Sequence, residues 1–130
     1  MTIILPIKPE YSSQIIAKQK TYEYRTKIPK QKVDSILIYE TYPTMRIVAK
    51  ITIKNILCGS PYEIWSATKK YAGITKEQFD AYFSNSKKAF AYEIGRIERF
   101  SEPKLLSEYG INYIPQSFVY IKDGTIRTQN

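Results

Sequence analysis

Hydrophobic and polar residues alternate along several short segments of this chain, and a two-residue period is typical of half-buried β-strands. In the clearest example, 47–54, the isoleucines fall on one face while Lys50 and Lys54 fall on the other. Alternation recurs at 21–25, and apolar runs mark other candidate strands. The further strands that the pattern predicts are 2–7, 35–39, 88–100 and 117–121.

Helix signals interrupt these strands near the start and in the middle of the chain. Pro9 suits a first helical position and predicts a helix to about Lys18. Capping boxes at 60–63 and 75–78 predict two more helices, with Gly73 ending the first of them. Strands without regular strand–helix–strand alternation predict an α+β fold, a small mixed β-barrel decorated by about three to four short helices.

Length and composition indicate one globular domain with its own core. The chain has 130 residues, of which 43% are hydrophobic and 14% aromatic. We expect a domain over 1–122 and a polar tail over 123–130. The apolar start is broken by Pro6, and Cys58 has no partner for a disulfide, so a cytoplasmic protein without a membrane partner is expected.

The charge balance and the missing histidines narrow the classes of function. The chain has 20 Lys and Arg residues and 12 Asp and Glu residues, which gives a net charge of +8 and favours nucleic acid as a partner. Without histidine, Ser-His-Asp and Cys-His nucleophile pairs and the usual zinc sites are excluded. We therefore expect no metal site and no cofactor, and any catalysis would use Lys, Thr, Tyr or carboxylate groups.

The segment 18–25 carries an unusual set of charges. Lys18 and Lys20 fall at the end of the first helix, and the following strand places Glu23 and Arg25 on the same face as Thr21. The alternating tyrosines at 22 and 24 then face the interior. The pattern alone favours a solvated face with a weak surface ion pair over a binding site.

Residues 15–25 resemble the helix-end signature of ASCH domains, G-x-K-x-x-E-x-R, and 111–120 resembles the closing strand of that family. The resemblance implies a PUA-like β-barrel with a cleft beside the first helix that binds RNA or another nucleic acid. It assigns the signature to Lys20, Glu23 and Arg25. Lys18 replaces the signature glycine, so it must either accept a left-handed conformation at a cost of about 1 kcal/mol or alter the turn.

Some ASCH-like proteins are small amidohydrolases that act on acylated cytidines, with a Thr nucleophile at the position that Glu23 holds here. A carboxylate between Lys20 and Arg25 is poorly suited to attack an amide, so we favour a binding protein. The alternative is an enzyme, either an N4-acylcytidine-type nucleoside amidohydrolase or a metal-independent ribonuclease, using Lys20, Thr21 and Glu23. A regulatory or protein-interaction domain is a third class.

The expected partner is RNA or a modified nucleotide, held by the signature residues and by side chains from other strands. Tyr39 is a candidate for base stacking, and the closing strand offers two polar side chains. The full set expected to bind is Lys18, Lys20, Thr21, Glu23, Arg25, Tyr39, Gln116 and Ser117. The sequence leaves the oligomeric state undetermined.

Overall fold

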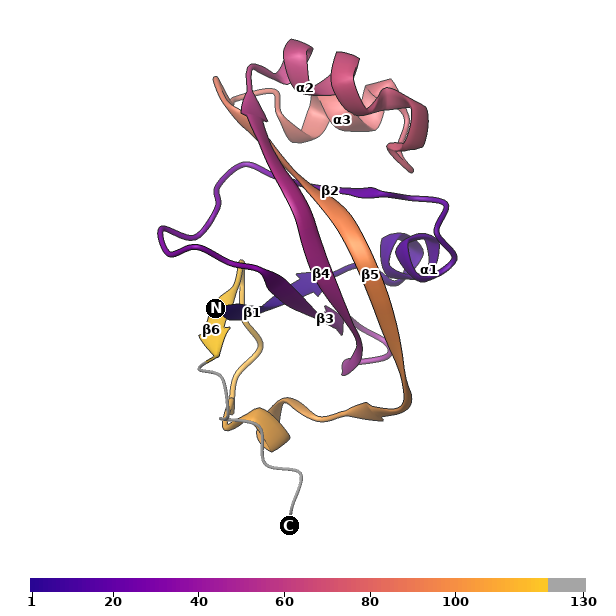
Figure 1. Ribbon diagram of the computed structural model, residues 1–130, viewed down its shortest axis with the longest axis vertical. Coiled ribbons are helices and arrows are strands. Elements are labelled where there is room, and N and C mark those ends of the chain that lie inside the picture. Colours follow the sequence, from indigo (N-terminus) through magenta and orange to yellow (C-terminus); the bar gives the residue numbers. More distant parts are fainter. Residues whose placement is uncertain (122–130) are drawn as a thin grey trace.

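A six-stranded mixed sheet forms the centre of the computed structural model, which describes residues 1–121 (Figure 1). Its strands are β1 (Thr2–Ile7), β2 (Tyr22–Arg25), β3 (Ser35–Glu40), β4 (Arg46–Gly59), β5 (Ala89–Lys104) and β6 (Val119–Ile121). The strand order is β2-β5-β4-β3-β1-β6. β1 and β3 run parallel, and every other neighbouring pair is antiparallel. The α+β class predicted from the sequence is confirmed.

Three α-helices and two short 3-10 turns accompany this sheet in the described residues. They are α1 (Pro9–Ile16), α2 (Pro61–Thr68), η1 (Lys69–Tyr71), α3 (Lys76–Tyr82) and η2 (Leu106–Tyr109). Both predicted capping boxes are present, since Ser60 accepts from the Glu63 N–H and Thr75 accepts from the Gln78 N–H. Sequence signals of this kind are local, which is why these two helix starts were predictable.

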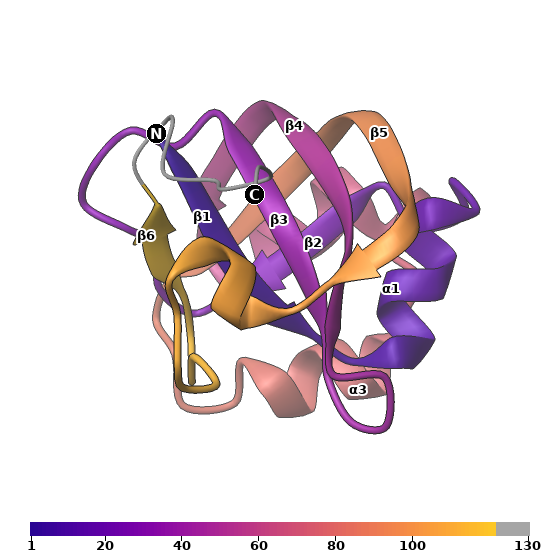
Figure 2. The same ribbon diagram turned by 90° about the horizontal axis from the view of Figure 1, so that it is seen from below.

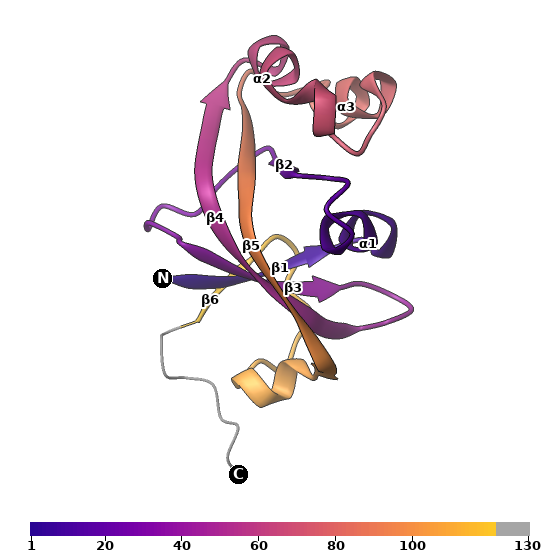
Figure 3. The ribbon, with the colours of Figure 1, turned by 45° about the vertical axis from the view of Figure 1, so that its right-hand side comes forward.

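α2 and α3 lie over one end of the long β4–β5 pair, whereas α1 lies lower beside β5 (Figures 1 and 3). The buried cluster under α2 and α3 includes Tyr24, Phe79 and Phe83, with Trp65 packed against it. The Tyr24 and Phe79 ring centroids are 5.1 Å apart in an edge-on arrangement. These aromatic residues form a core cluster, and their packing fixes α3 above β2.

The closed barrel expected from the sequence is not confirmed. Within residues 1–121 the sheet is open, with the four-residue β2 at one edge and the three-residue β6 at the other. Figure 2 shows β6 beside β1. Pro6 explains part of the opening. Its carbonyl accepts from Arg25 of β2, and its nitrogen, which faces the same way, has no proton for a strand ladder. A side chain therefore bridges β1 and β2 where a barrel would have backbone hydrogen bonds.

The expected polar tail at 123–130 lies outside the described residues, so the predicted domain limits stay a prediction. Among residues 1–121, none of the helices has the length and apolar content needed to cross a membrane.

The turn that ends α1 delivers the charged segment to the site. Lys18 has φ = 64°, in the left-handed region, and its N–H donates to the Ile15 carbonyl. The Gln19 N–H donates to the Gln14 carbonyl, so the two bonds complete a Schellman motif with Lys18 at the position usually held by glycine. Of the two alternatives that the sequence left open, the Lys18 backbone therefore adopts the left-handed conformation, and the turn is not altered.

We predict that Lys18→Gly stabilises the fold by about 1 kcal/mol, because glycine adopts a positive φ without the Cβ clash that Lys18 incurs. Ala17→Gly is the control, since Ala17 has φ = −77° and gains nothing from glycine. Urea unfolding monitored through Trp65 measures both changes. A Lys18→Gly variant that is no more stable than the parent contradicts the assignment of strain to this turn.

Candidate functional site

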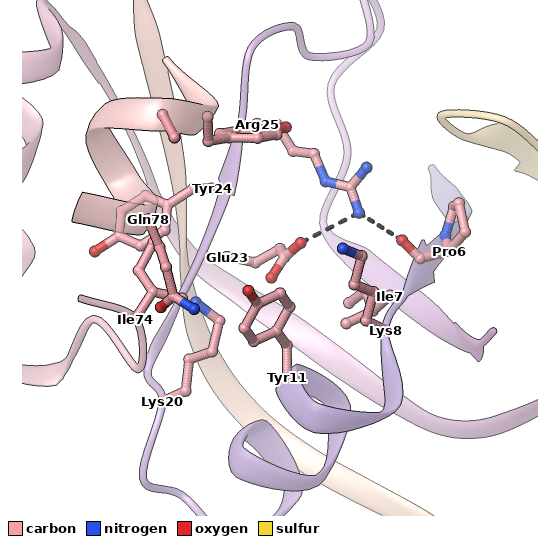
Figure 4. A pocket seen from close by; sticks show the side chains of 12 residues that line it. Pro6, Ile7, Lys8, Tyr11, Lys20, Glu23, Tyr24, Arg25, Ile74 and Gln78 are labelled. Atoms are coloured by element: carbon pink, nitrogen blue, oxygen red, sulfur yellow. Dashed lines mark hydrogen bonds and ion pairs between the residues drawn. The ribbon is translucent and has the colours of Figure 1, made fainter. Parts of the chain in front are cut away.

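A cavity of about 440 Å³ lies between the β1–α1 junction, β2 and α3 (Figure 4). It occupies the opening of the sheet beside β2, where Arg25 rather than a backbone ladder joins β2 to β1. The residues that line it are Pro6, Ile7, Lys8, Tyr11, Lys20, Glu23, Tyr24, Arg25, Ile74, Gln78, Ala81 and Tyr82. The volume falls in the range of small-molecule sites in proteins.

Lys20 is the most deeply buried charged residue of this site, with 2% of its surface exposed. Its Nζ donates to the Ala72 carbonyl at 2.8 Å and lies 4.7 Å from the centroid of the Tyr24 ring. The Tyr11 ring centroid is 5.5 Å away. A carbonyl and two ring faces therefore hold the ammonium group, and cation–π contacts of this kind are attractive when desolvated.

Burial is the largest influence on the Lys20 amine and lowers its pKa below the ordinary value of 10.5. The Glu23 carboxylate raises this pKa and the Arg25 guanidinium lowers it. No carboxylate among residues 1–121 lies within ion-pair distance of Lys20. The neutral amine is therefore easier to form at Lys20 than at an exposed lysine.

Glu23 and Arg25 form an ion pair beside Lys20. The Arg25 Nη2 lies 3.2 Å from Glu23 Oε2 and donates to the Pro6 carbonyl at 2.6 Å. Glu23 is 6% exposed, so the interpretation of this strand as a solvated face is wrong. The strand faces the cavity instead, because α3 and the β1–α1 junction cover it.

The loop between α2 and α3 contacts Lys20 through Ala72 and Gly73 and positions its side chain. Gly73 has φ = +73°, and a Cβ on it would lie 2.7 Å from both Cβ and Cγ of Lys20. The preceding carbonyl, that of Ala72, accepts from the Lys20 amine. Glycine is therefore required here both by its backbone angle and by the close passage of the lysine stem.

Aromatic and amide groups complete the walls, and the sequence did not single them out as a site. Tyr82 follows the buried Phe79 by one helical turn, yet it lines the cavity and is 46% exposed. Gln78 turns its Oε1 to the Thr75 N–H, which leaves its amide N–H groups as donors at the cavity. Helical spacing does not identify Tyr82 or Gln78 as cavity residues, because it does not show which other segment α3 packs against.

The structure brings only part of the predicted binding set together. Lys20, Glu23 and Arg25 line the cavity, whereas Thr21 does not and uses its backbone N–H and carbonyl in hydrogen bonds to Tyr71 and Ile94. The other predicted residues lie away from the cavity lining. Tyr39 is 2% exposed within a core cluster, Lys18 is exposed on the α1 turn, and Gln116 and Ser117 are exposed before β6.

Carboxylates are too sparse here for a metal centre. Within residues 1–121, no three Cys, Asp or Glu side chains gather closely enough to hold a metal ion. Glu23 supplies the carboxylate of the cavity, and Lys8, Lys20 and Arg25 supply its cations. The described groups suit hydrogen bonding to an organic ligand that carries negative charge.

The fold and the site thus define an α+β domain with an open mixed sheet and a pocket beside the first helix that Lys8, Lys20, Glu23 and Arg25 help to line. The family model of the ASCH domain matches residues 5–101, and the chain belongs to this family. The resemblance seen in the sequence is confirmed.

Individual relatives extend the similarity. The chain is 29% identical over 123 residues to large ribosomal subunit protein uL22 of Ureaplasma parvum serovar 3, covering 93% of this chain but 39% of that protein, so it spans well under half of that relative. An ASCH domain-containing ribonuclease of Zymomonas mobilis is 28% identical over 90 residues, 68% of this chain and 61% of the ribonuclease. The crystal structure of ASCH from Zymomonas mobilis shares the fold, with a TM-score of 0.86 and 23% identity, covering 95% of this chain and 90% of that one.

We predict that Gly73→Ala displaces Lys20 from its buried position, because the added Cβ would overlap the lysine stem. The pKa of Lys20 should then rise toward 10.5, since exposure to water removes the desolvation that lowers it. NMR titration of the lysine side-chain signals measures this change.

Gly110→Ala is the matched control. Gly110 has φ = +76°, and a Cβ there meets no atom within 4 Å. Both variants should lose about 1 kcal/mol of stability from the left-handed backbone, but only Gly73→Ala should move the Lys20 titration. An unchanged Lys20 titration in Gly73→Ala contradicts the positioning role of this loop.

Proposed function

We propose that this protein binds single-stranded RNA by taking one base, or a modified nucleotide, into the cavity beside β2. The observation that carries the proposal is the lining itself. It combines three cations, one buried carboxylate and three tyrosines around a volume suited to a small organic ligand. Lysines and arginines meet phosphates, and tyrosine rings stack on bases, in proteins that bind single-stranded nucleic acid.

The groups divide between the rim and the floor of the cavity. Lys8 is exposed at the β1–α1 junction and suits contact with a phosphate of the RNA backbone. Tyr82 is partly exposed on α3 and suits stacking on a base. Glu23 and Lys20 are buried and suit hydrogen bonding to a base edge that has lost its water.

Membership of the ASCH family supports RNA as the ligand, as does a relative whose name is an ASCH domain-containing ribonuclease. The net charge of +8 adds long-range attraction to a polyanion. Lys18 on the α1 turn can extend the contact with phosphates, because it is exposed and carries no ion pair within the described residues.

We predict that Lys8→Gln weakens binding to single-stranded RNA and lowers the slope of log K against log salt by about 1, because one phosphate contact is lost. Lys54→Gln is the control, since Lys54 is an exposed lysine on β4 outside the cavity lining. Fluorescence anisotropy at several salt concentrations measures both slopes. Equal slopes for the two variants, or no RNA binding at low salt, would exclude this function.

A metal-independent ribonuclease is the second candidate, and the lowered pKa of Lys20 favours it. A neutral Lys20 amine would accept the proton of a ribose 2′-hydroxyl while the 2′-oxygen attacks the adjacent phosphorus. The bond from phosphorus to the 5′-oxygen then breaks, and that oxygen takes a proton from water. The proton on Lys20 neutralises the hydroxide that remains, which restores the neutral amine. The products are a 2′,3′-cyclic phosphate and a 5′-hydroxyl end.

For this second candidate, cleavage of labelled RNA in EDTA should rise with pH and level off as Lys20 loses its proton, at a pH below that of an exposed lysine. Lys20→Arg should abolish cleavage, because arginine stays protonated, and Lys54→Arg should not. Product analysis would identify the cyclic phosphate. N4-acetylcytidine in a parallel reaction tests the amidohydrolase alternative, for which Glu23 stands in place of the nucleophilic threonine.

A further inference from the structure

We infer that the cavity selects guanine among the four RNA bases. The inference rests on the proposed function, because it concerns the base that the cavity would hold. It follows from the hydrogen-bonding groups that remain available on Glu23 and Lys20 at the cavity floor. These two side chains differ in kind, since a carboxylate only accepts hydrogen bonds and an ammonium only donates them.

Glu23 keeps most of its accepting capacity for a ligand. Its Oε2 is occupied by one contact, from Arg25, at 3.2 Å, and Oε1 accepts from no group among residues 1–121. A carboxylate has about four lone-pair positions on its two oxygens. Glu23 can therefore accept two parallel N–H groups from a base while it retains Arg25.

Lys20 keeps a donor for a ligand. One of its three N–H groups is used on the Ala72 carbonyl, and its remaining near neighbours are the faces of Tyr11 and Tyr24. A carbonyl oxygen in the cavity would be the first strong acceptor available to these remaining protons within the described part of the chain. Such a bond also compensates the burial of the ammonium charge.

The bases differ in how many of these groups they satisfy. Guanine presents two adjacent donors, N1–H and the N2 amine, to Glu23 and its O6 carbonyl to Lys20, which makes three charge-assisted bonds. Adenine and cytosine present one amine beside a ring nitrogen that only accepts, and uracil presents one N–H between two carbonyls. Adenine, cytosine and uracil each make two charge-assisted bonds to Glu23 and Lys20, so guanine makes one more than any of them.

The decisive measurement compares nucleoside 5′-monophosphates on the unmodified protein by isothermal titration calorimetry. Inosine monophosphate lacks only the N2 amine of guanosine monophosphate, so the pair isolates the extra bond. One charge-assisted hydrogen bond corresponds to about a ten- to hundredfold difference in affinity. We expect GMP to bind that much more tightly than IMP, AMP, CMP and UMP.

Glu23→Gln supplies an independent test, because an amide replaces one acceptor with a donor and no longer matches two adjacent N–H groups. The variant should lose the preference for GMP over IMP. Glu77→Gln, an exposed change on α3 outside the cavity lining, should retain it. If Glu23→Gln does not fold, the GMP and IMP comparison on the parent protein decides alone.

The outcomes separate this inference from the function on which it rests. Equal affinities for GMP and IMP overturn guanine selection and leave the binding of RNA intact. RNA binding without any binding of mononucleotides overturns guanine selection too. If the protein binds neither RNA nor mononucleotides, the proposed function and the inference are overturned together.

Discussion

The burial of the Lys20 ammonium is the constraint on which the rest of the site depends. A buried cation with no carboxylate in ion-pair distance needs other compensation, and here the Ala72 carbonyl and two tyrosine rings supply it. That arrangement requires the left-handed turn at Lys18, which precedes Lys20 in the chain, and the close approach of Gly73 to the Lys20 side chain. The pocket exists because three separate segments converge on one side chain.

A second interaction explains why the sheet stays open where the cavity lies. Arg25 reaches from β2 to the Pro6 carbonyl of β1 and pairs with Glu23 on the way. A backbone ladder at this place would bring the two strands to about 5 Å and fill the space that the cavity occupies. The side-chain bridge holds the strands farther apart, so the opening of the sheet and the cavity are one feature.

Local features were predictable from the sequence and non-local ones were not. The capping boxes at Ser60 and Thr75 depend on neighbours within a few residues. For Lys18 the sequence left two alternatives open, a left-handed conformation or an altered turn, and the structure shows the first. Tyr39 was assigned to binding because an exposed and a buried strand tyrosine look alike in sequence, yet packing places it in the core. Tyr82 gave no signal in the sequence, because helical spacing alone does not show that α3 turns it to the cavity.

The sequence by itself determined the α+β class, the helix starts and the charged segment that marks the ASCH family. Its short-range patterns encode these, because caps, alternation and the signature spacing act within one element. Only the tertiary structure decided that Lys20 and Glu23 are buried and that Lys8, Gln78 and Tyr82 join them. Burial depends on which distant segments meet, and here α3, more than fifty residues after Lys20, closes the site.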